Sequence, residues 1–183
     1  GYAPGGVAGD TSAKANWNLG AKATVAGVTG AASTFRAQDA ASKDLTVNSF
    51  GATTTVGKLT GTVGYSTVKT DVGYAPANLT TVATATTLLG GVSGVDGKVT
   101  TVGAKYQVTP KLASTVAYYK GKYTNAATSQ AGDLKSYVLW NQYDFTKRTN
   151  AYAELDYTKS NGDLATGVSS NNVGATVGVR HTF

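Results

Sequence analysis

The C-terminal stretch Val173-Gly174-Ala175-Thr176-Val177-Gly178-Val179-Arg180-His181-Thr182-Phe183 decides the fold prediction. Counting from Val173, every second residue is Val, Ala, His or Phe, and the residues between them are Gly, Thr or Arg. Successive side chains of a β-strand point to opposite faces. The stretch therefore predicts a strand with one face toward hydrocarbon and the other toward water. Phe183 would anchor its end at the membrane–water boundary, where aromatic side chains concentrate.

Similar alternation recurs along the rest of the 183-residue chain, which is rich in the β-branched residues that favour strands. No segment approaches the ~20 consecutive apolar residues of a spanning helix, whereas a tilted strand crosses a bilayer with about 9–11 residues. We expect an all-β fold, an antiparallel transmembrane β-barrel that occupies residues 1–183 as one domain. The nine predicted strands are 12–23, 28–38, 43–54, 59–71, 98–108, 112–124, 133–145, 149–159 and 172–183.

The connections between these strands alternate in length. Short turns are predicted around residues 25–27, 56–58, 109–111 and 146–148, and longer links at 39–42, 72–97, 125–132 and 160–171. Short turns on one rim and long loops on the other are typical of outer-membrane barrels. Two hairpins, at residues 106–112 and 143–149, also resemble each other and indicate a repeated up-and-down unit. A soluble or surface β-sandwich, such as an adhesin-like module that presents the 72–97 link, stays open as the alternative.

The alternation of inward and outward residues in the last strand can be applied to the earlier predicted strands. It then predicts which side chains line a water-filled lumen and which face the membrane. The predicted charged lining consists of Lys22, Arg36, Lys105, Glu154, Asp156 and Arg180. The predicted anchors at the membrane interface are Trp17, Tyr106, Tyr143, Tyr157, His181 and Phe183. Inward charges tune the selectivity of a pore, although Glu154 and Asp156 could instead pair with neighbouring cations and stiffen the wall.

Two predicted strands fit the inside–outside rule poorly. In 112–124, the favoured parity turns Leu112, Val116 and Tyr118 outward and takes Lys120 with them. The other parity would turn Ala117, Tyr119 and Tyr123 outward. A lysine near the rim can extend its charged end to water. In 133–145, the favoured parity turns Asn141 outward and Trp140 inward, the reverse of what lipid would select.

The composition argues against catalytic and metal chemistry. The chain has no Cys and one His, His181, so thiol nucleophiles are absent, and a Ser-His-Asp site would need His181 itself. The glycine-rich stretch 90–98 lacks the spacing of a phosphate-binding loop. We expect no enzyme, no cofactor, no metal and no nucleic-acid partner. Sixteen Lys and Arg against ten Asp and Glu give a net charge of +6, which favours anions as solutes.

Three segments resemble general porins of β-proteobacteria. They are Val177–Phe183, the hairpin Tyr143–Thr149 followed by Ala151-Tyr152-Ala153, and the opening Gly5–Asp10. The resemblance implies a sixteen-stranded barrel in the bacterial outer membrane, a homotrimer in contact with lipid and lipopolysaccharide, that passes small hydrophilic solutes or ions. Nine strands are too few for sixteen. The chain is therefore expected to be the C-terminal half of such a barrel and to need an N-terminal half, which would carry the constriction loop.

Overall fold

The computed structural model describes residues 1–5, 13–75, 92–165 and 170–183. These residues form strands and one short 3-10 helix, and none of their helical residues makes a segment long and apolar enough to span a membrane. The strands are β1 (Tyr2–Ala3), β2 (Asn16–Val25), β3 (Val28–Gln38), β4 (Asp44–Val56), β5 (Leu59–Thr70), β6 (Val95–Gln107), β7 (Leu112–Asn125), β8 (Gln130–Asp144), β9 (Thr149–Gly162) and β10 (Asn171–His181). The helix is η1 (Asp163–Ala165).

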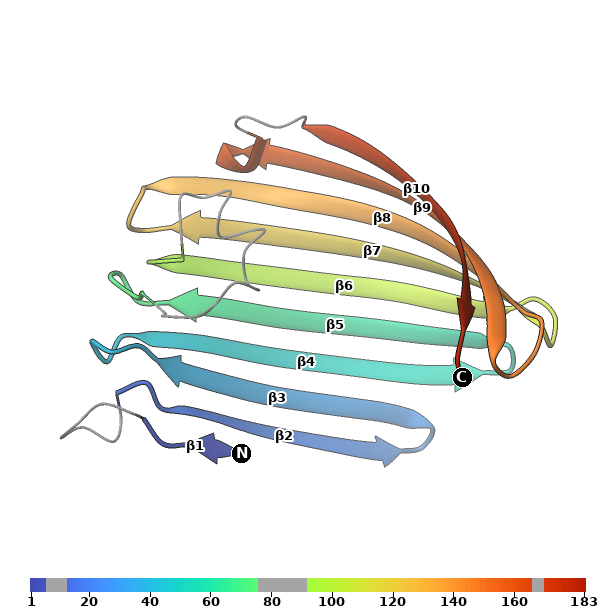
Figure 1. The fold of residues 1–183 in the computed structure, drawn as a ribbon, viewed down its shortest axis with the longest axis horizontal. Coiled ribbons are helices and arrows are strands. Elements are labelled where there is room, and N and C mark those ends of the chain that lie inside the picture. The colour runs from blue at the N-terminus through green and yellow to red at the C-terminus, as the bar shows by residue number, and fades with distance from the viewer. Residues whose placement is uncertain (6–12, 76–91, 166–169) are drawn as a thin grey trace.

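The strands form one ten-stranded antiparallel sheet in which each strand pairs with its neighbours in the sequence. Figure 1 shows a curved sheet that is open between its edge strands, β1 and β10. The all-β antiparallel prediction is confirmed, and the sheet is part of a barrel wall. The sandwich alternative is wrong, because the described residues form no second sheet that could pack on the first.

The predicted count of nine strands is corrected to ten. The additional strand, β1, has only two residues, too few for a periodic pattern. β2 begins at Asn16 instead of residue 12, β6 begins at Val95 instead of 98, and β8 begins at Gln130 instead of 133. The predicted long link at 125–132 thereby shrinks to a turn at 126–129, so loop lengths alternate less regularly than expected. Most of the 72–97 link, nearly all of Gly5–Asp10 and the start of the 90–98 stretch lie outside the described residues.

The connections β2–β3, β4–β5, β6–β7 and β8–β9 of this up-and-down path all lie on the same edge of the sheet. We call the edge with residues 26–27, 57–58, 108–111 and 145–148 and the C-terminus the turn rim, and the opposite edge the loop rim (Figure 1). The two similar hairpins lie on the turn rim and share one geometry. The Thr109 hydroxyl accepts the amides of Lys111 and Leu112 at 3.2 and 3.0 Å, and the Thr146 hydroxyl accepts those of Arg148 and Thr149 at 3.1 and 3.0 Å.

The register divides the strand residues into two faces, because residues directly opposite each other in an antiparallel pair lie on the same side. We call the side that bears Val177 the outer face and the side that bears Thr176 the inner face. A row on the outer face runs Val102–Tyr118–Tyr137–Tyr157–Val173. Apolar side chains such as Val63, Val116 and Leu155 are exposed there, as expected for a wall that meets lipid.

The register agrees with the preferred parity in both difficult strands. Lys120 accompanies Tyr118 on the outer face, opposite Lys135. Trp140 lies on the inner face opposite Glu154, and Asn141 lies on the outer face opposite Ala153. Asn141 is not isolated there, because its side-chain oxygen accepts a 2.6 Å hydrogen bond from the Ser114 hydroxyl on the same face. This bond lowers the cost of an amide in an apolar surface.

The buried core lies at the loop rim rather than in the middle of the sheet. Leu45, Tyr74, Val95 and Leu164 are each at most 3% exposed, and they come from four different segments of the chain. The Thr70 hydroxyl ties this core together, accepting the Val95 amide at 2.8 Å and donating to the Val92 carbonyl at 2.5 Å. Elsewhere both faces of the sheet are open, as a wall between lipid and water would be.

Candidate functional site

The inner face is a polar wall built mostly from Ser, Thr, Gly and Ala. The strand residues on this face include three cations, Lys22, Lys105 and Arg180, and three carboxylates, Asp144, Glu154 and Asp156. Lys22, Lys105 and Arg180 are exposed, and Glu154 and Asp156 are half-buried. Within the described part of the chain neither Glu154 nor Asp156 forms an ion pair. The overall charge of +6 is therefore not concentrated on the inner face, and it gives no basis for an anion preference.

Glycines on β10 let two large inner-face side chains lie close to the wall. Gly178 is opposite Tyr152 and Gly174 is opposite Asp156. A Cβ atom at Gly178 would lie 2.5 Å from the Tyr152 hydroxyl, so a side chain there could not coexist with this ring position. The Tyr152 ring also stacks on Trp140, with centroids 4.6 Å apart and planes at 11°. The missing side chain at Gly178 thus leaves room for the Tyr152 ring beside β10.

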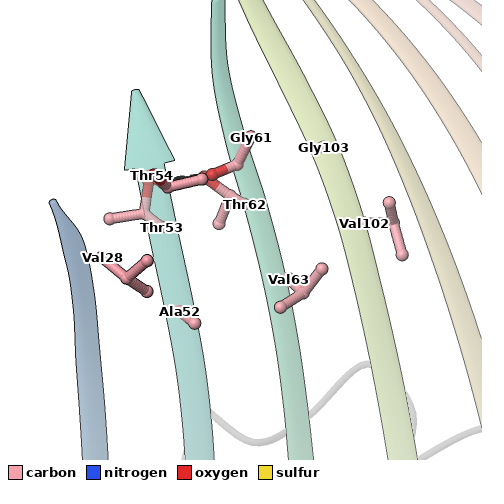
Figure 2. Close-up of a pocket in the computed structure, with 9 residues that line it drawn as sticks. All are labelled: Val28, Ala52, Thr53, Thr54, Gly61, Thr62, Val63, Val102 and Gly103. Carbon is pink, nitrogen blue, oxygen red and sulfur yellow. Dashed lines mark hydrogen bonds between the residues drawn. The ribbon is translucent and has the colours of Figure 1, made fainter. Parts of the chain in front are cut away.

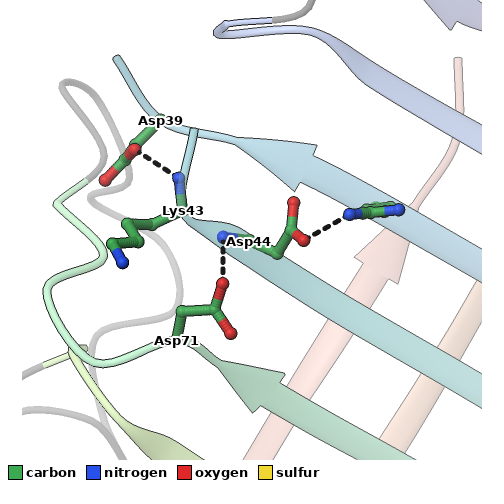
Figure 3. Close-up of polar contacts among 5 residues, drawn as sticks. Asp39, Lys43, Asp44 and Asp71 are labelled. Carbon is green, nitrogen blue, oxygen red and sulfur yellow. Dashed lines mark hydrogen bonds and ion pairs between the residues drawn. The ribbon is translucent and has the colours of Figure 1, made fainter. Parts of the chain in front are cut away.

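A polar network at the loop rim joins the β3–β4 and β5–β6 connections through the carboxylates of Asp39 and Asp71 (Figure 3). The Asp39 carboxylate is 4% exposed. It accepts the amides of Ala41, Lys43 and Ala75 at 2.8, 2.9 and 2.8 Å. Next to it the Asp71 carboxylate accepts the Asp44 amide at 3.0 Å. Asp39 could not be found from the sequence, because its partners are backbone amides that leave no signature in the residue pattern.

Burial alone would raise the pKa of Asp39, but hydrogen bonds from the Ala75, Lys43 and Ala41 amides and the charge of Lys43 outweigh it and hold the pKa below its usual range. A carboxyl group with a lowered pKa in the folded state stabilises the fold above its ordinary pKa of about 4. That contribution is lost as the pH falls through the lowered value. The rim network is thus expected to be intact at neutral pH and to loosen in acid.

Asp39→Asn is expected to loosen the rim at neutral pH as well. The asparagine side chain keeps the shape of Asp39, but one carboxylate oxygen is replaced by an NH₂ group. This group is a donor, so it cannot accept hydrogen bonds from the backbone amides that donate to the carboxylate in the wild-type protein. A hydrogen bond to a charged group is worth about 1.5–3 kcal/mol, so hydrogen exchange at the Ala75 amide should accelerate roughly 10- to 100-fold at pH 7. Asp144→Asn on the turn rim is the matched control. Unchanged exchange at Ala75 in Asp39→Asn would contradict the role of the carboxylate.

The predicted anchors all lie on the outer face or at its end, at different heights. Tyr106, Tyr143, His181 and Phe183 lie near the turn rim, and Trp17 lies near the loop rim. Tyr157 is farther from the rims, and its ring packs on Tyr137 at 6.3 Å. The His181 imidazole contacts the Phe183 ring edge-to-face at 4.9 Å, and its Nδ1 atom shares a 2.9 Å hydrogen bond with the Thr149 hydroxyl. His181 is thus held among outer-face residues.

Arg36 does not lie with the predicted lumen charges, and its prediction is corrected. It is directly opposite Trp17 on β2 and Thr46 on β4, which places it on the outer face near the loop rim. Its guanidinium forms an ion pair with Asp44 on the same face. The pairing partner explains why a cation is tolerated there, because the carboxylate and the nearby water of the rim offset the cost of a charge on an apolar wall.

A shallow apolar groove crosses the outer face over β4, β5 and β6 (Figure 2). It opens above Gly61, between the valine side chains of Val28, Val63 and Val102. None of the residues that line it can titrate or act as a nucleophile near a base. Among the described residues, no three His, Cys, Asp or Glu side chains gather where they could hold a metal ion. The groove has the chemistry of a surface that packs against acyl chains.

The comparisons with known proteins define the class. The sequence pattern of the Gram-negative porin family matches residues 1–163. The chain belongs to this family and is an outer-membrane β-barrel protein, as the C-terminal stretch predicted. No curated protein matches the chain significantly.

Solved structures of OmpT, an outer membrane protein of Vibrio cholerae, share the fold. Outer-membrane expressed OmpT is 18% identical, with a TM-score of 0.66 over 92% of this chain and 56% of that chain. A loop L8 deletion mutant is 20% identical, with a TM-score of 0.64 over 91% and 53%. A trimer form is 19% identical, with a TM-score of 0.63 over 92% and 57%. The chain thus spans a little more than half the length of the structures it matches.

Proposed function

We propose that the protein contributes one part of the wall of a water-filled channel through which small hydrophilic solutes diffuse passively. The observation that carries this proposal is the division of the sheet into an apolar outer face and a polar inner face. A wall of this kind separates lipid from a lumen. The inner face offers small hydroxyl side chains and balanced charges, which suit the passage of many polar solutes better than the binding of one.

Closure of the barrel requires further strands between β1 and β10, which we propose are supplied by another segment of the same porin. We further propose a homotrimer as the assembled form, with outer-membrane lipid around it. One of the OmpT structures is of a trimer form. Catalysis has no support in the described residues, because His181 contacts Phe183 and Thr149 on the outer face and lies away from the inner-face carboxylates. We therefore propose a non-enzymatic role.

Planar-bilayer recording of the full-length protein tests the channel. Stepwise conductance that rises with salt concentration is the expected result, and its absence would refute the proposal. The enzymatic alternative is tested separately: if a hydrolytic activity were found and His181→Ala abolished it, the non-enzymatic assignment would be wrong.

Neutralising the inner-face carboxylates is expected to change ion selectivity. Glu154→Gln with Asp156→Asn would leave three cations, Lys22, Lys105 and Arg180, against a single carboxylate, Asp144, on this part of the wall. At 0.1 M salt, where screening acts over about 10 Å, the anion-to-cation permeability ratio should rise roughly twofold. The reversal potential in a salt gradient measures the ratio. Asp96→Asn with Asp133→Asn makes the same charge change on the outer face and should leave the ratio as it is.

A further inference from the structure

The inner face carries two aromatic side chains that the channel proposal does not use. Trp140 on β8 and Tyr152 on β9 stack on each other, with ring centroids 4.6 Å apart and planes at 11°. We call these two residues the ring pair. Both are half-buried, so part of each ring remains exposed on the inner face. The other tryptophan of the chain, Trp17, lies on the outer face, where lipid favours it.

The neighbours of Trp140 on the inner face of β7 are short. Thr115 is directly opposite Trp140, and Ala113 and Ala117 lie on either side of Thr115 on the same face. Stacking on Tyr152 uses one face of the indole ring, and the three short side chains of β7 leave part of the other face open. Trp140 therefore offers a solute an aromatic surface on the inner wall.

One carboxylate lies directly beside the ring pair. Glu154 is directly opposite Trp140 in the register of β8 and β9, so their Cβ atoms are about 4.5–5.5 Å apart. Glu154 is half-buried and forms no ion pair within the described ranges. Asp156, the next inner-face carboxylate on β9, lies instead against Gly174, in the space that a Cβ atom there would take. Glu154 is thus the carboxylate that accompanies the rings.

The cations of the inner face lie farther from Trp140 than Glu154 does. Lys105 is in the same row as Trp140 but two strands away on β6, about 10 Å at the usual strand spacing. Arg180 lies on β10 in the row nearest the turn rim, which also contains Asp144. Lys22 is on β2, on the other side of the sheet. The charge closest to Trp140 is therefore negative, and it favours a positively charged solute at this place.

We propose that the ring pair and Glu154 form a weak binding site for small organic cations of the quaternary ammonium type. Aromatic faces attract a cation that lies within about 6 Å, and tryptophan does so most strongly. The methyl groups of such an ion would pack on the indole, and Glu154 would supply the opposite charge. One ring face and one carboxylate hold a solute weakly, so other polar solutes would still pass. The inference rests on the proposed function, in which the inner face meets water.

Saturation-transfer NMR of the full-length protein, in a detergent without a choline headgroup, tests the site with choline as the probe. The comparison probe is the neutral alcohol in which a carbon atom replaces the charged nitrogen of choline. The wild-type protein should bind choline at least about fivefold more tightly than this alcohol, because the ring face and the carboxylate both act on the charge. An equal affinity for both probes would overturn the proposal.

Two single variants test the residues of the site. Trp140→Leu and Glu154→Gln should each weaken choline binding by about threefold or more. Trp140→Tyr should keep most of the binding, because it retains an aromatic face. The matched control is Trp17→Leu with Asp96→Asn, which removes a tryptophan and a carboxylate from the outer face and should leave choline binding unchanged. Unchanged binding in either Trp140→Leu or Glu154→Gln would overturn the proposal.

The test is independent of folding and of conductance. The preference of the wild-type protein for choline needs no variant, and Glu154→Gln keeps the shape of a side chain that has no ion pair to lose. Choline binding by a protein that failed to conduct would refute the channel and leave the cation site standing. Conductance without choline binding would overturn the cation site and leave the channel standing.

Discussion

Leu155→Arg is expected to lower the free energy of unfolding by about 2–4 kcal/mol in a lipid bilayer, the cost of a cation on the lipid-facing wall near the midplane. Leu155 lies midway along β9 on the outer face, is 55% exposed, and is directly opposite Leu139 and Ala175. No carboxylate faces it from either neighbouring strand. The guanidinium introduced by Leu155→Arg would therefore have to leave water without gaining a partner, whereas the guanidinium of Arg36 has Asp44.

The matched control is Thr176→Arg on the neighbouring strand. Thr176 is directly opposite Glu154 on the inner face, where water and a carboxylate are both available. Urea unfolding of the full-length protein in lipid vesicles measures the difference, which should exceed tenfold in the folding equilibrium, since about 1.4 kcal/mol corresponds to a factor of ten. If Thr176→Arg were the more strongly destabilised variant, the two faces would be assigned the wrong way round. Equal destabilisation of both variants would contradict the difference between an apolar outer face and a polar inner face.

The alternation along each strand is local, which is why the sequence could predict which residues of one strand share a side of the sheet. In β10 the period of two is unbroken from Val173 to Val179, and in β9 it separates Leu155 and Tyr157 from Glu154 and Asp156. The register of the β9–β10 pair places the apolar residues of one strand directly opposite the apolar residues of the other. Once one strand is oriented, every in-register neighbour follows, because a shift by one residue would turn every side chain over.

Arg36 was misplaced because its strand carries little periodic signal. β3 has Phe35 on one parity and Val28 on the other, with Ala and Thr on both, so the segment alone does not choose a face. The choice is made by pairing with β2 and β4, which brings Arg36 next to Trp17 and toward Asp44. A cation in a predicted barrel is assigned to the lumen by default, and only a partner on the outer face reverses that assignment.

The core at the loop rim could not be predicted for a different reason. Leu45, Tyr74, Val95 and Leu164 are far apart in the sequence, and each belongs to a segment whose local pattern indicates only a strand end or a link. The same holds for the close approach of Tyr152 to Gly178, which follows from the register of two strands. Period-two patterns specify faces, whereas the contacts that close the rim depend on how distant segments meet.

Leu164→Ala is the second substitution with a large expected effect. Leu164, in η1, is 1% exposed and lies over Gly132 on the inner face, where a Cβ atom would be 2.7 Å from the leucine Cγ. The neighbouring Asp163 carboxylate accepts the Ala131 amide at 2.7 Å and fixes η1 to the start of β8. Truncating a fully buried leucine typically costs about 2–5 kcal/mol, and here the loss should fall mainly on the docking of η1 to β8.

The expected result is faster hydrogen exchange at the Ala131 amide, by at least about tenfold, with little change at the turn rim. Leu139→Ala is the matched control, because Leu139 is 38% exposed on the outer face, where lipid or detergent refills the space that the side chain leaves. If the two variants had equal effects on Ala131, the packing of Leu164 on Gly132 would not be what holds η1. Because η1 is attached on the inner face at the loop rim, its release in the proposed channel would also alter the mouth. Leu164→Ala should therefore increase the noise of the open-channel current, whereas Leu139→Ala should not.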